Sequence, residues 1–151
     1  MSDRHLYKAK RTDNGEWIKG DLITVSFSRN GKQEKSTYIF DTTKAGNDCF
    51  ENFSEGDGIF KVDEKTVCQC TGIKDKNGNL IWENDIVKES GGVRGVIRFG
   101  KYGDMKTDYG FYIEWDKTQP YWRNDILYWQ SDIMTIGSAI DNPELLEGGA
   151  E

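Results

Sequence analysis

Polar and apolar residues alternate along several short stretches of this chain. Between residues 22 and 28, Ile23, Val25 and Phe27 fall on one face, and a threonine and two serines fall on the other. A repeat of two residues is the period of a half-buried β-strand. The same pattern, or a short apolar run, marks further strands at residues 36–41, 59–62, 67–71, 85–88, 93–99, 110–115 and 133–140. These stretches predict a mainly β protein, with an α+β fold as the alternative.

Asn-Gly pairs lie between several of the predicted strands. Asn30-Gly31 separates the first two strands, and Asn77-Gly78 lies between two apolar runs near the middle of the chain. Only residues that tolerate positive φ fit a type I′ turn, so an Asn-Gly pair is a strong signal for a tight hairpin. We therefore expect antiparallel hairpins, with a type I′ turn at Asn77-Gly78.

Residues 120–130 fit two patterns. Trp122, Asp125, Ile126 and Trp129 recur at helical spacing. Pro120 and the aromatic and β-branched content suit an extended segment instead. The sequence leaves both conformations open for this segment.

A short helix is expected near the C-terminus. Asn142 is a capping residue type, Pro143 suits the first helical position, and Glu144 places an acid in the first turn. This helix should end near Gly148.

The length of 151 residues suits one compact domain that buries roughly 70% of its unfolded surface. We therefore expect a single domain over residues 1–151, and a division of that domain into two lobes is a variant of this interpretation. The N-terminus is polar, and no apolar run approaches the roughly 18 residues that a membrane helix needs. These features predict a cytoplasmic protein with no membrane partner.

The net charge of −6 makes nucleic acid an unfavoured partner. Affinity for duplex nucleic acid depends mainly on neutralising phosphates, and this chain is locally basic only between Arg4 and Arg11. Residues 93–130 are nearly neutral, with six Lys or Arg against five Asp or Glu. This region is the one that leaves nucleic-acid binding open.

Three segments of the chain resemble the YopX family of phage and prophage proteins. They are residues 14–20 (NGEWIKG), 62–88 (VDEKTVCQCTGIKDKNGNLIWENDIVK) and 136–147 (IGSAIDNPELLE). The resemblance implies a mostly β protein with a small barrel in its C-terminal half. The two lobes would then be an N-terminal sheet lobe over residues 1–70 and a small β-barrel lobe over residues 71–147. The resemblance also implies a gene carried by phages or prophages, and it implies no particular biochemical activity.

This chain departs from the family pattern at three positions. Cys68 and Cys70 stand where the family usually has a small residue and a tyrosine, and Asn84 stands where it has a glycine. The cysteine pair is therefore not expected to be a family-wide site. Asn84 can replace glycine because asparagine also tolerates positive φ.

The cysteines and the histidine do not form a convincing metal site. Structural zinc needs four Cys or His ligands, and the chain offers Cys49, Cys68, Cys70 and His5 without the usual spacing. On a strand, Cys68 and Cys70 would share a face as small, half-buried residues. We expect reduced thiols, no bound metal and no cofactor.

Carboxylates near the central hairpin raise the question of acid-base catalysis. Asp75, Glu83 and Asp85 flank turns and alternate with lysines, as solvated turn residues do. Asp85 is a candidate to accept hydrogen bonds from backbone amides at the start of its strand. No nucleophile and base can be nominated beside these acids, so we expect a protein that is not an enzyme.

Aromatic residues are concentrated between residues 99 and 129, which hold ten of the nineteen in the chain. Alternation places some of them in the core, and an excess of Trp and Tyr near residues 116–130 would form an interaction patch. The candidate patch residues are Tyr121, Trp122, Tyr128 and Trp129.

Two functions remain after these considerations. The first is a phage-encoded accessory protein that binds a protein partner, or a second copy of itself, through exposed aromatic residues and a sheet edge. The alternative is a small barrel that binds single-stranded nucleic acid by stacking bases on its aromatic rings.

Overall fold

The structure is a computed structural model that describes residues 5–41, 58–103, 105–118, 121 and 123–147. Strands make up 56% of the structure and pair in antiparallel fashion, which confirms the prediction of a mainly β fold. The chain divides into two compact units, one within residues 4–69 and the other within residues 70–151. The two units are described separately below.

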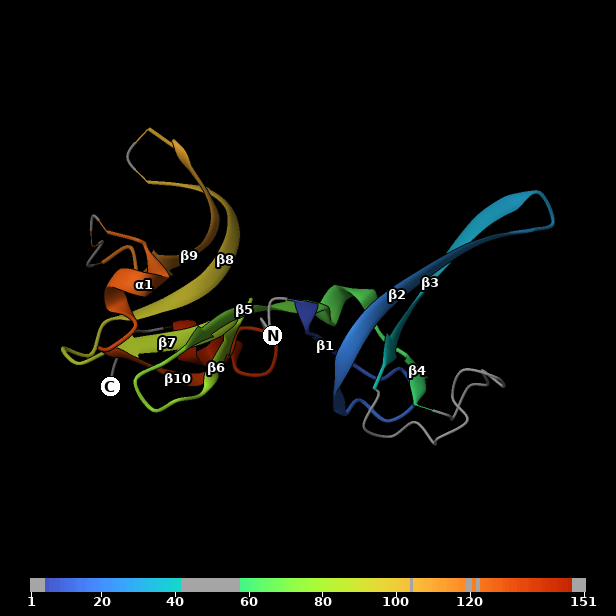
Figure 1. The fold of residues 1–151 in the computed structure, drawn as a ribbon, viewed down its shortest axis with the longest axis horizontal. Coiled ribbons are helices and arrows are strands. Elements are labelled where there is room, and N and C mark those ends of the chain that lie inside the picture. The colour runs from blue at the N-terminus through green and yellow to red at the C-terminus, as the bar shows by residue number, and fades with distance from the viewer. Residues whose placement is uncertain (1–4, 42–57, 104, 119–120, 122, 148–151) are drawn as a thin grey trace. The chain divides into compact units, whose positions relative to one another are not determined.

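The N-terminal unit is built on a long hairpin (Figure 1). Its strands are β1 (Tyr7–Lys10), β2 (Trp17–Arg29), β3 (Lys32–Phe40) and β4 (Ile59–Lys61), followed by a 3-10 turn, η2 (Glu64–Thr66). The strand order is β4-β3-β2-β1, and the first residues of β5 (Cys68–Lys74) pair with β1. The buried core of this unit consists of Ala9, Ile18, Ile39 and Val62.

The C-terminal unit contains an open four-stranded sheet in the order β10-β7-β8-β9 (Figure 1). Its strands are β7 (Asp85–Glu89), β8 (Arg94–Tyr102), β9 (Asp108–Trp115) and β10 (Ile133–Ser138), and a short hairpin forms between β5 and β6 (Leu80–Trp82). Because β9 and β10 are the two outer strands, this sheet does not close into a barrel. The barrel expected for residues 71–147 is therefore wrong for the described residues.

Two turns of helix accompany this sheet. The ambiguous segment 120–130 contains a four-residue α-helix, α1 (Ile126–Trp129). The expected C-terminal helix is one 3-10 turn, η3 (Pro143–Leu146), and the side chain of Asn142 does not cap it. That side chain instead accepts a hydrogen bond from the backbone N–H of Ser138, which leaves the first turn of η3 uncapped.

The core of the C-terminal unit lies on one face of the sheet. Its members are mainly β-branched or aromatic side chains from the strands and α1: Ile81, Val87, Ile97, Ile113, Trp115, Ile126 and Ile133. Gly95 makes room for this core, since a Cβ atom there would lie 2.6 Å from Ile113 Cγ2 and 3.0 Å from Trp115 Cε3. The face of β8 and β9 that carries the core is therefore tightly packed at Gly95.

The two Asn-Gly pairs adopt different turns. Asn30 and Gly31 have φ values of +52° and +76° and join paired residues Arg29 and Lys32, which confirms a type I′ hairpin turn. At Asn77-Gly78 only the glycine has positive φ, so the expected type I′ turn is wrong there. This hairpin has a longer loop, in which the N–H of Gly78 donates to the carbonyl of Asp75.

The side chain of Asp75 explains the longer loop. One carboxylate oxygen accepts the backbone N–H groups of Asn77 at 2.9 Å and Asn79 at 3.0 Å. The other accepts the N–H of Thr135 on β10 at 3.0 Å. The carboxylate therefore organises the loop and also attaches the β5-β6 hairpin to strand β10.

Asp75 is buried, and this affects its ionisation. Burial by itself raises the pKa of Asp75, but hydrogen bonds from the backbone amides of Thr135, Asn79 and Asn77 outweigh burial and hold the pKa below its usual value. A lowered folded-state pKa stabilises the fold above the pKa of an unfolded aspartate. That stabilisation is lost as the pH falls through the folded-state pKa.

Asn84 lies in the turn between β6 and β7 with a φ of +69°. Its backbone N–H donates to the carbonyl of Ile97, and its carbonyl accepts from Ala139. The expectation that asparagine here adopts positive φ in place of glycine is confirmed.

Replacing Asp75 with asparagine tests the role of the carboxylate. We expect Asp75→Asn to lower the free energy of unfolding by about 2 kcal/mol or more at neutral pH, because an NH₂ group would replace an oxygen that accepts backbone amides. In urea unfolding followed by tryptophan fluorescence, the difference from wild type should shrink as the pH falls below the ordinary aspartate pKa of about 3.9, because the lowered pKa of folded Asp75 makes its stabilisation disappear in that range. Glu147→Gln, which alters an exposed carboxylate of the same unit, is the control. Equal stability of Asp75→Asn and wild type at neutral pH would contradict this role.

Replacing Gly95 with alanine tests the packing beneath β8. The added methyl group would meet Ile113 and Trp115, so we expect the free energy of unfolding to fall by about 1–3 kcal/mol. Urea unfolding measures this change, and near-UV circular dichroism should report a disturbed Trp115. An unchanged stability would show that the strand has space at this position.

Candidate functional site

Strands β8 and β9 present two different faces along their shared register. Ile97 pairs with Ile113, and Phe99 pairs with Phe111, so these side chains lie on the face that carries the core. Arg98 pairs with Tyr112 on the opposite face. Residues alternate between the two faces of a strand, so one hairpin carries both an apolar surface and a polar one.

Tyr121 and residues 123–129 cover part of the apolar face. The rings of Tyr121 and Trp129 lie 5.1 Å and 5.0 Å from the ring of Trp115, and both side chains pack against the core. The backbone carbonyl of Arg123 accepts hydrogen bonds from the indole nitrogens of Trp115 and Trp129, each at 2.9 Å. These contacts hold α1 against the end of the β8-β9 hairpin that contains Trp115, away from the hairpin tip.

The four predicted patch residues therefore have different surroundings. Tyr121 and Trp129 are partly buried against the core, and burial raises the pKa of the Tyr121 phenol, with further contributions from Glu89 and Asp132. Tyr128 is 54% exposed on α1, and its ring lies beneath the guanidinium of Arg123. Trp122 lies outside the described residues.

Two further exposed rings lie nearer the tip of the β8-β9 hairpin. Phe99 is 47% exposed and Tyr109 is 69% exposed, and their rings meet edge to face with centroids 5.2 Å apart. Phe99 also contacts Phe111, which packs against the core. The sequence predicts the patch within residues 121–129 and does not identify Phe99 and Tyr109. The density of aromatic residues along the chain does not show where α1 stops covering the sheet.

We define the aromatic surface as the exposed large apolar residues on strands β8 and β9 and on α1. Leu127 is 70% exposed beside Tyr128, and α1 contacts β9. In Figure 1, β8 and β9 curve onward beyond α1. The members of the aromatic surface are Phe99, Tyr109, Leu127 and Tyr128.

Strand β9 is an outer strand of its sheet, and part of its edge is covered. The N–H of Ile113 donates to the carbonyl of Asn124 at 2.9 Å, and the side-chain amide of Asn124 donates to the carbonyl of Ile113 at 2.8 Å. Asn124 thus occupies both backbone groups of Ile113, as a residue of a neighbouring strand would. Among the described residues, β8 is the one strand that pairs with β9.

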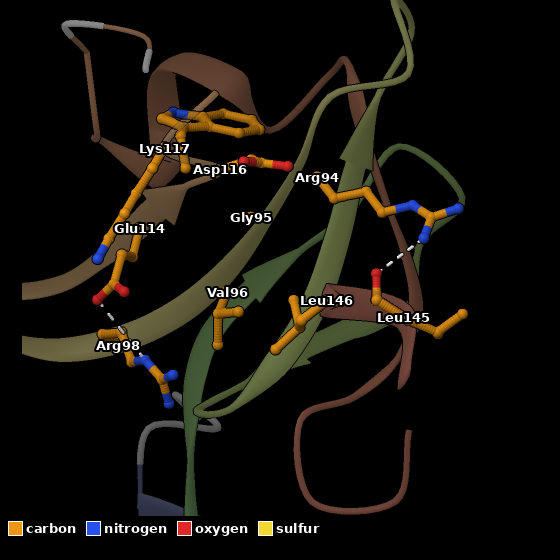
Figure 2. A pocket seen from close by; sticks show the side chains of 10 residues that line it. Arg94, Gly95, Val96, Arg98, Glu114, Asp116, Lys117, Leu145 and Leu146 are labelled. Atoms are coloured by element: carbon orange, nitrogen blue, oxygen red, sulfur yellow. Dashed lines mark hydrogen bonds and ion pairs between the residues drawn. The ribbon is translucent and has the colours of Figure 1, made fainter. Parts of the chain in front are cut away.

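The polar face of the hairpin forms one wall of a groove with η3 (Figure 2). The groove has a volume of about 250 Å³, and Val96 and Leu146 line it between charged side chains. The guanidinium of Arg94 donates to the carbonyl of Leu145 at 2.8 Å, which attaches η3 to β8. Its charged lining consists of Arg94, Arg98, Lys117, Glu114 and Asp116.

The cations of this groove lie among carboxylates. Arg98 donates to the side-chain oxygen of Asn84 at 2.9 Å, and its Nε lies 3.8 Å from a carboxylate oxygen of Glu114. Both side chains are well exposed, so solvent weakens this ion pair. The groove presents both signs of charge, which suits a polar protein segment better than a row of phosphates.

A second hollow lies at the far end of the polar face, with a volume of about 280 Å³ and Tyr102 in its lining. The ring of Tyr102 stacks on Tyr112 with centroids 5.2 Å apart. Burial raises the pKa of Tyr102, and the nearby Asp125 and Asp108 raise it further. The Tyr102 hydroxyl therefore stays protonated at neutral pH and can donate a hydrogen bond.

The acidic residues near the central hairpin have structural partners. Asp75 binds the amides described above, and Asp85 accepts the backbone N–H of Trp82 at 2.8 Å, as its position in the sequence suggested. Glu89, which sequence reasoning did not single out, accepts the N–H groups of Gly91 and Val93. Glu83 is partly exposed in the turn before β7.

The other residues considered from the sequence lie apart from the aromatic surface. Cys68 and Cys70 are fully buried on β5, more completely than the expected half-burial, and Cys49 lies outside the described residues. His5 is exposed near the N-terminus. Within the described ranges, no three His, Cys, Asp or Glu side chains converge as metal ligands would. None of the helices in those ranges has the length and apolar character needed to cross a membrane.

Comparisons with known proteins identify the family. One solved structure similar to this chain is that of protein EF1440 from Enterococcus faecalis, with 20% sequence identity, a TM-score of 0.40, and coverage of 93% of this chain and 96% of that one. No curated protein matches the chain. The family model described as "YopX protein" matches residues 6–147. Because this match spans nearly the whole sequence, the chain belongs to the YopX family.

Proposed function

We propose that this chain is a non-enzymatic protein-interaction module, encoded by a phage or prophage and acting in the cytoplasm of the bacterial host. Membership of the YopX family supports the phage or prophage origin, because the family resemblance carries that implication. The interaction role rests on the aromatic surface of the C-terminal unit.

The observation that carries the proposal is the exposure of large apolar side chains on neighbouring elements. Phe99 and Tyr109 on the hairpin, and Leu127 and Tyr128 on α1, are each between 47% and 70% exposed. Leaving aromatic rings in water forgoes the stabilisation that their burial would give. Tyr, Phe and Trp are enriched where proteins bind one another, since each ring buries a large area at little cost in conformational entropy.

Two of the acids that suggested catalysis, Asp75 and Asp85, support a structural interpretation instead. Both are buried and accept hydrogen bonds from backbone N–H groups, as Glu89 also does. The amides that bind Asp75 hold its pKa below the usual value, so this carboxylate is poorly suited to exchange a proton near neutral pH. These residues maintain the sheet that carries the aromatic surface.

The alternative function, binding of single-stranded nucleic acid, receives less support from the charges. Arg98 lies beside Glu114 in the groove, and Arg123 pairs with Asp125 at 3.1 Å. Each of these pairs leaves little net positive charge for a phosphate. Protein binding therefore remains the preferred proposal.

Capture of a partner tests the proposed function. Tagged wild type, incubated with lysate of phage-infected or lysogenic host cells, should retain a specific protein. Retention by the double variant Phe99→Ser/Tyr128→Ser should fall at least about tenfold, because interface rings contribute much of the binding energy. Val25→Ser, which removes an exposed apolar residue of the N-terminal unit, is the matched control and should retain the partner. Equal retention by wild type and the double variant, or no specific capture by wild type, would count against the proposal.

A nucleic-acid titration tests the alternative. We expect fluorescence anisotropy at low salt to show no binding of labelled single-stranded DNA or RNA below about 100 μM protein, because acids accompany the basic side chains. Binding in the micromolar range that weakens with salt and with Arg98→Gln would favour the nucleic-acid function instead.

A further inference from the structure

We propose that the partner of the aromatic surface is a second copy of this chain, which pairs with the part of the β9 edge that no described residue covers. Two four-stranded sheets would then join edge to edge in a symmetric dimer. This inference rests on the proposed function, since it names a partner for the same surface.

The first step concerns the edge of β9. The N–H and C=O of Ile113 point away from β8, because both are bound to Asn124. Backbone groups alternate in direction along a strand, so those of Phe111 and Tyr109 point to the same outer edge. Asn124 covers this edge at Ile113, and α1 follows directly after it in the chain.

The second step concerns what protects the edge. Natural sheet edges are commonly blocked by lysine, proline, a bulge or a covering loop. Residues 109–113 read Tyr-Gly-Phe-Tyr-Ile and contain no charged residue and no proline. Their register with β8 is continuous. This stretch is therefore a suitable template for another strand.

The third step is that the edge complements itself under a two-fold axis. With the axis at Gly110, Tyr109 lies opposite Phe111 of the second copy, and Phe111 lies opposite its Tyr109. All four of these residues direct their backbone groups to the shared edge, so the two pairs can exchange hydrogen bonds as an antiparallel ladder requires. Gly110 of each copy meets at the axis without a side chain.

The side chains fit the same register. Tyr109 and Phe111 lie on the apolar face with Phe99, so the pairing gathers rings from both copies into one cluster. Cross-strand aromatic pairs are favourable in sheets. On the polar face, Asp108 would lie opposite Tyr112 of the second copy, where a phenol can donate to a carboxylate. None of the directly opposed pairs between residues 108 and 112 joins two like charges.

The buried area sets the expected strength. An aromatic side chain buries about 150–250 Å², and Phe99 and Tyr109 are roughly half to two-thirds exposed. These rings would bury roughly 250 Å² on each copy. A standard interface of about 1,600 Å² buries about 800 Å² on each partner, so this contact is much smaller. We therefore expect a weak dimer whose population rises with protein concentration.

Sedimentation equilibrium of the full chain over a wide concentration range tests the association. Wild type should shift from monomer to dimer, and Tyr109→Lys should raise the dimer dissociation constant at least about tenfold by placing a charge on the edge. Val25→Lys, which places the same charge at an exposed apolar residue of the N-terminal unit outside the aromatic surface, is the matched control and should dimerise as wild type does. A wild type that stays monomeric, or equal effects of the two substitutions, would overturn the proposal.

Cross-linking tests the register. In a Cys49→Ser background, Asp108→Cys/Tyr112→Cys should form disulfide-linked dimers on mild oxidation, because directly opposed residues lie within disulfide range. Either cysteine alone should not, since it would face Tyr112 or Asp108. Dimers from both single variants, or none from the double variant, would overturn the register. A monomeric wild type that still captures a different protein through Phe99 and Tyr128 would overturn self-pairing and leave the proposed function standing.

Discussion

The C-terminal unit depends on a buried carboxylate that satisfies three backbone amides at once. Asp75 fixes the loop after β5 through Asn77 and Asn79 and reaches Thr135 on β10. A second link, from the N–H of Lys76 to the carbonyl of Ile133, runs beside it. Because buried donors without acceptors are costly, loss of this carboxylate would disturb both the hairpin and the outer strand.

Once β10 is held in this way, the other side of the sheet determines what the unit can bind. The core covers β8 and β9 near Trp115, where the carbonyl of Arg123 holds two indole groups. Toward the tip the cover ends, and Phe99 and Tyr109 remain exposed. Among the described residues, Asn124 binds the outer edge of β9 at Ile113, and much of the remaining edge has no partner strand. Apolar surface and strand edge thus coincide in one place.

The sequence predicted the strands because alternation reports which side chains share a face, and that rule depends only on local geometry. It predicted the wrong turn at Asn77 because the side chain of Asp75 binds the loop amides, which local turn preferences do not include. It also grouped Tyr121 and Trp129 with exposed rings. Their burial depends on contacts with Trp115, which are long-range and leave no periodic signal. The small barrel, which the family resemblance implied, is wrong because closure depends on pairing between the outer strands, and β9 and β10 do not pair in the described residues.

Within the described residues, this sheet is firmly held on the β10 side by Asp75 and is open along much of β9. Residue-resolved amide hydrogen exchange in dilute solution measures this directly. We expect slow exchange at the amide of Thr135, which is bound to Asp75, and at that of Ile113, which is bound to Asn124. We expect much faster exchange at the amides of Tyr109 and Phe111. Exchange at those two amides as slow as at Ile113 would show that the edge is already covered within one chain, and would contradict the account.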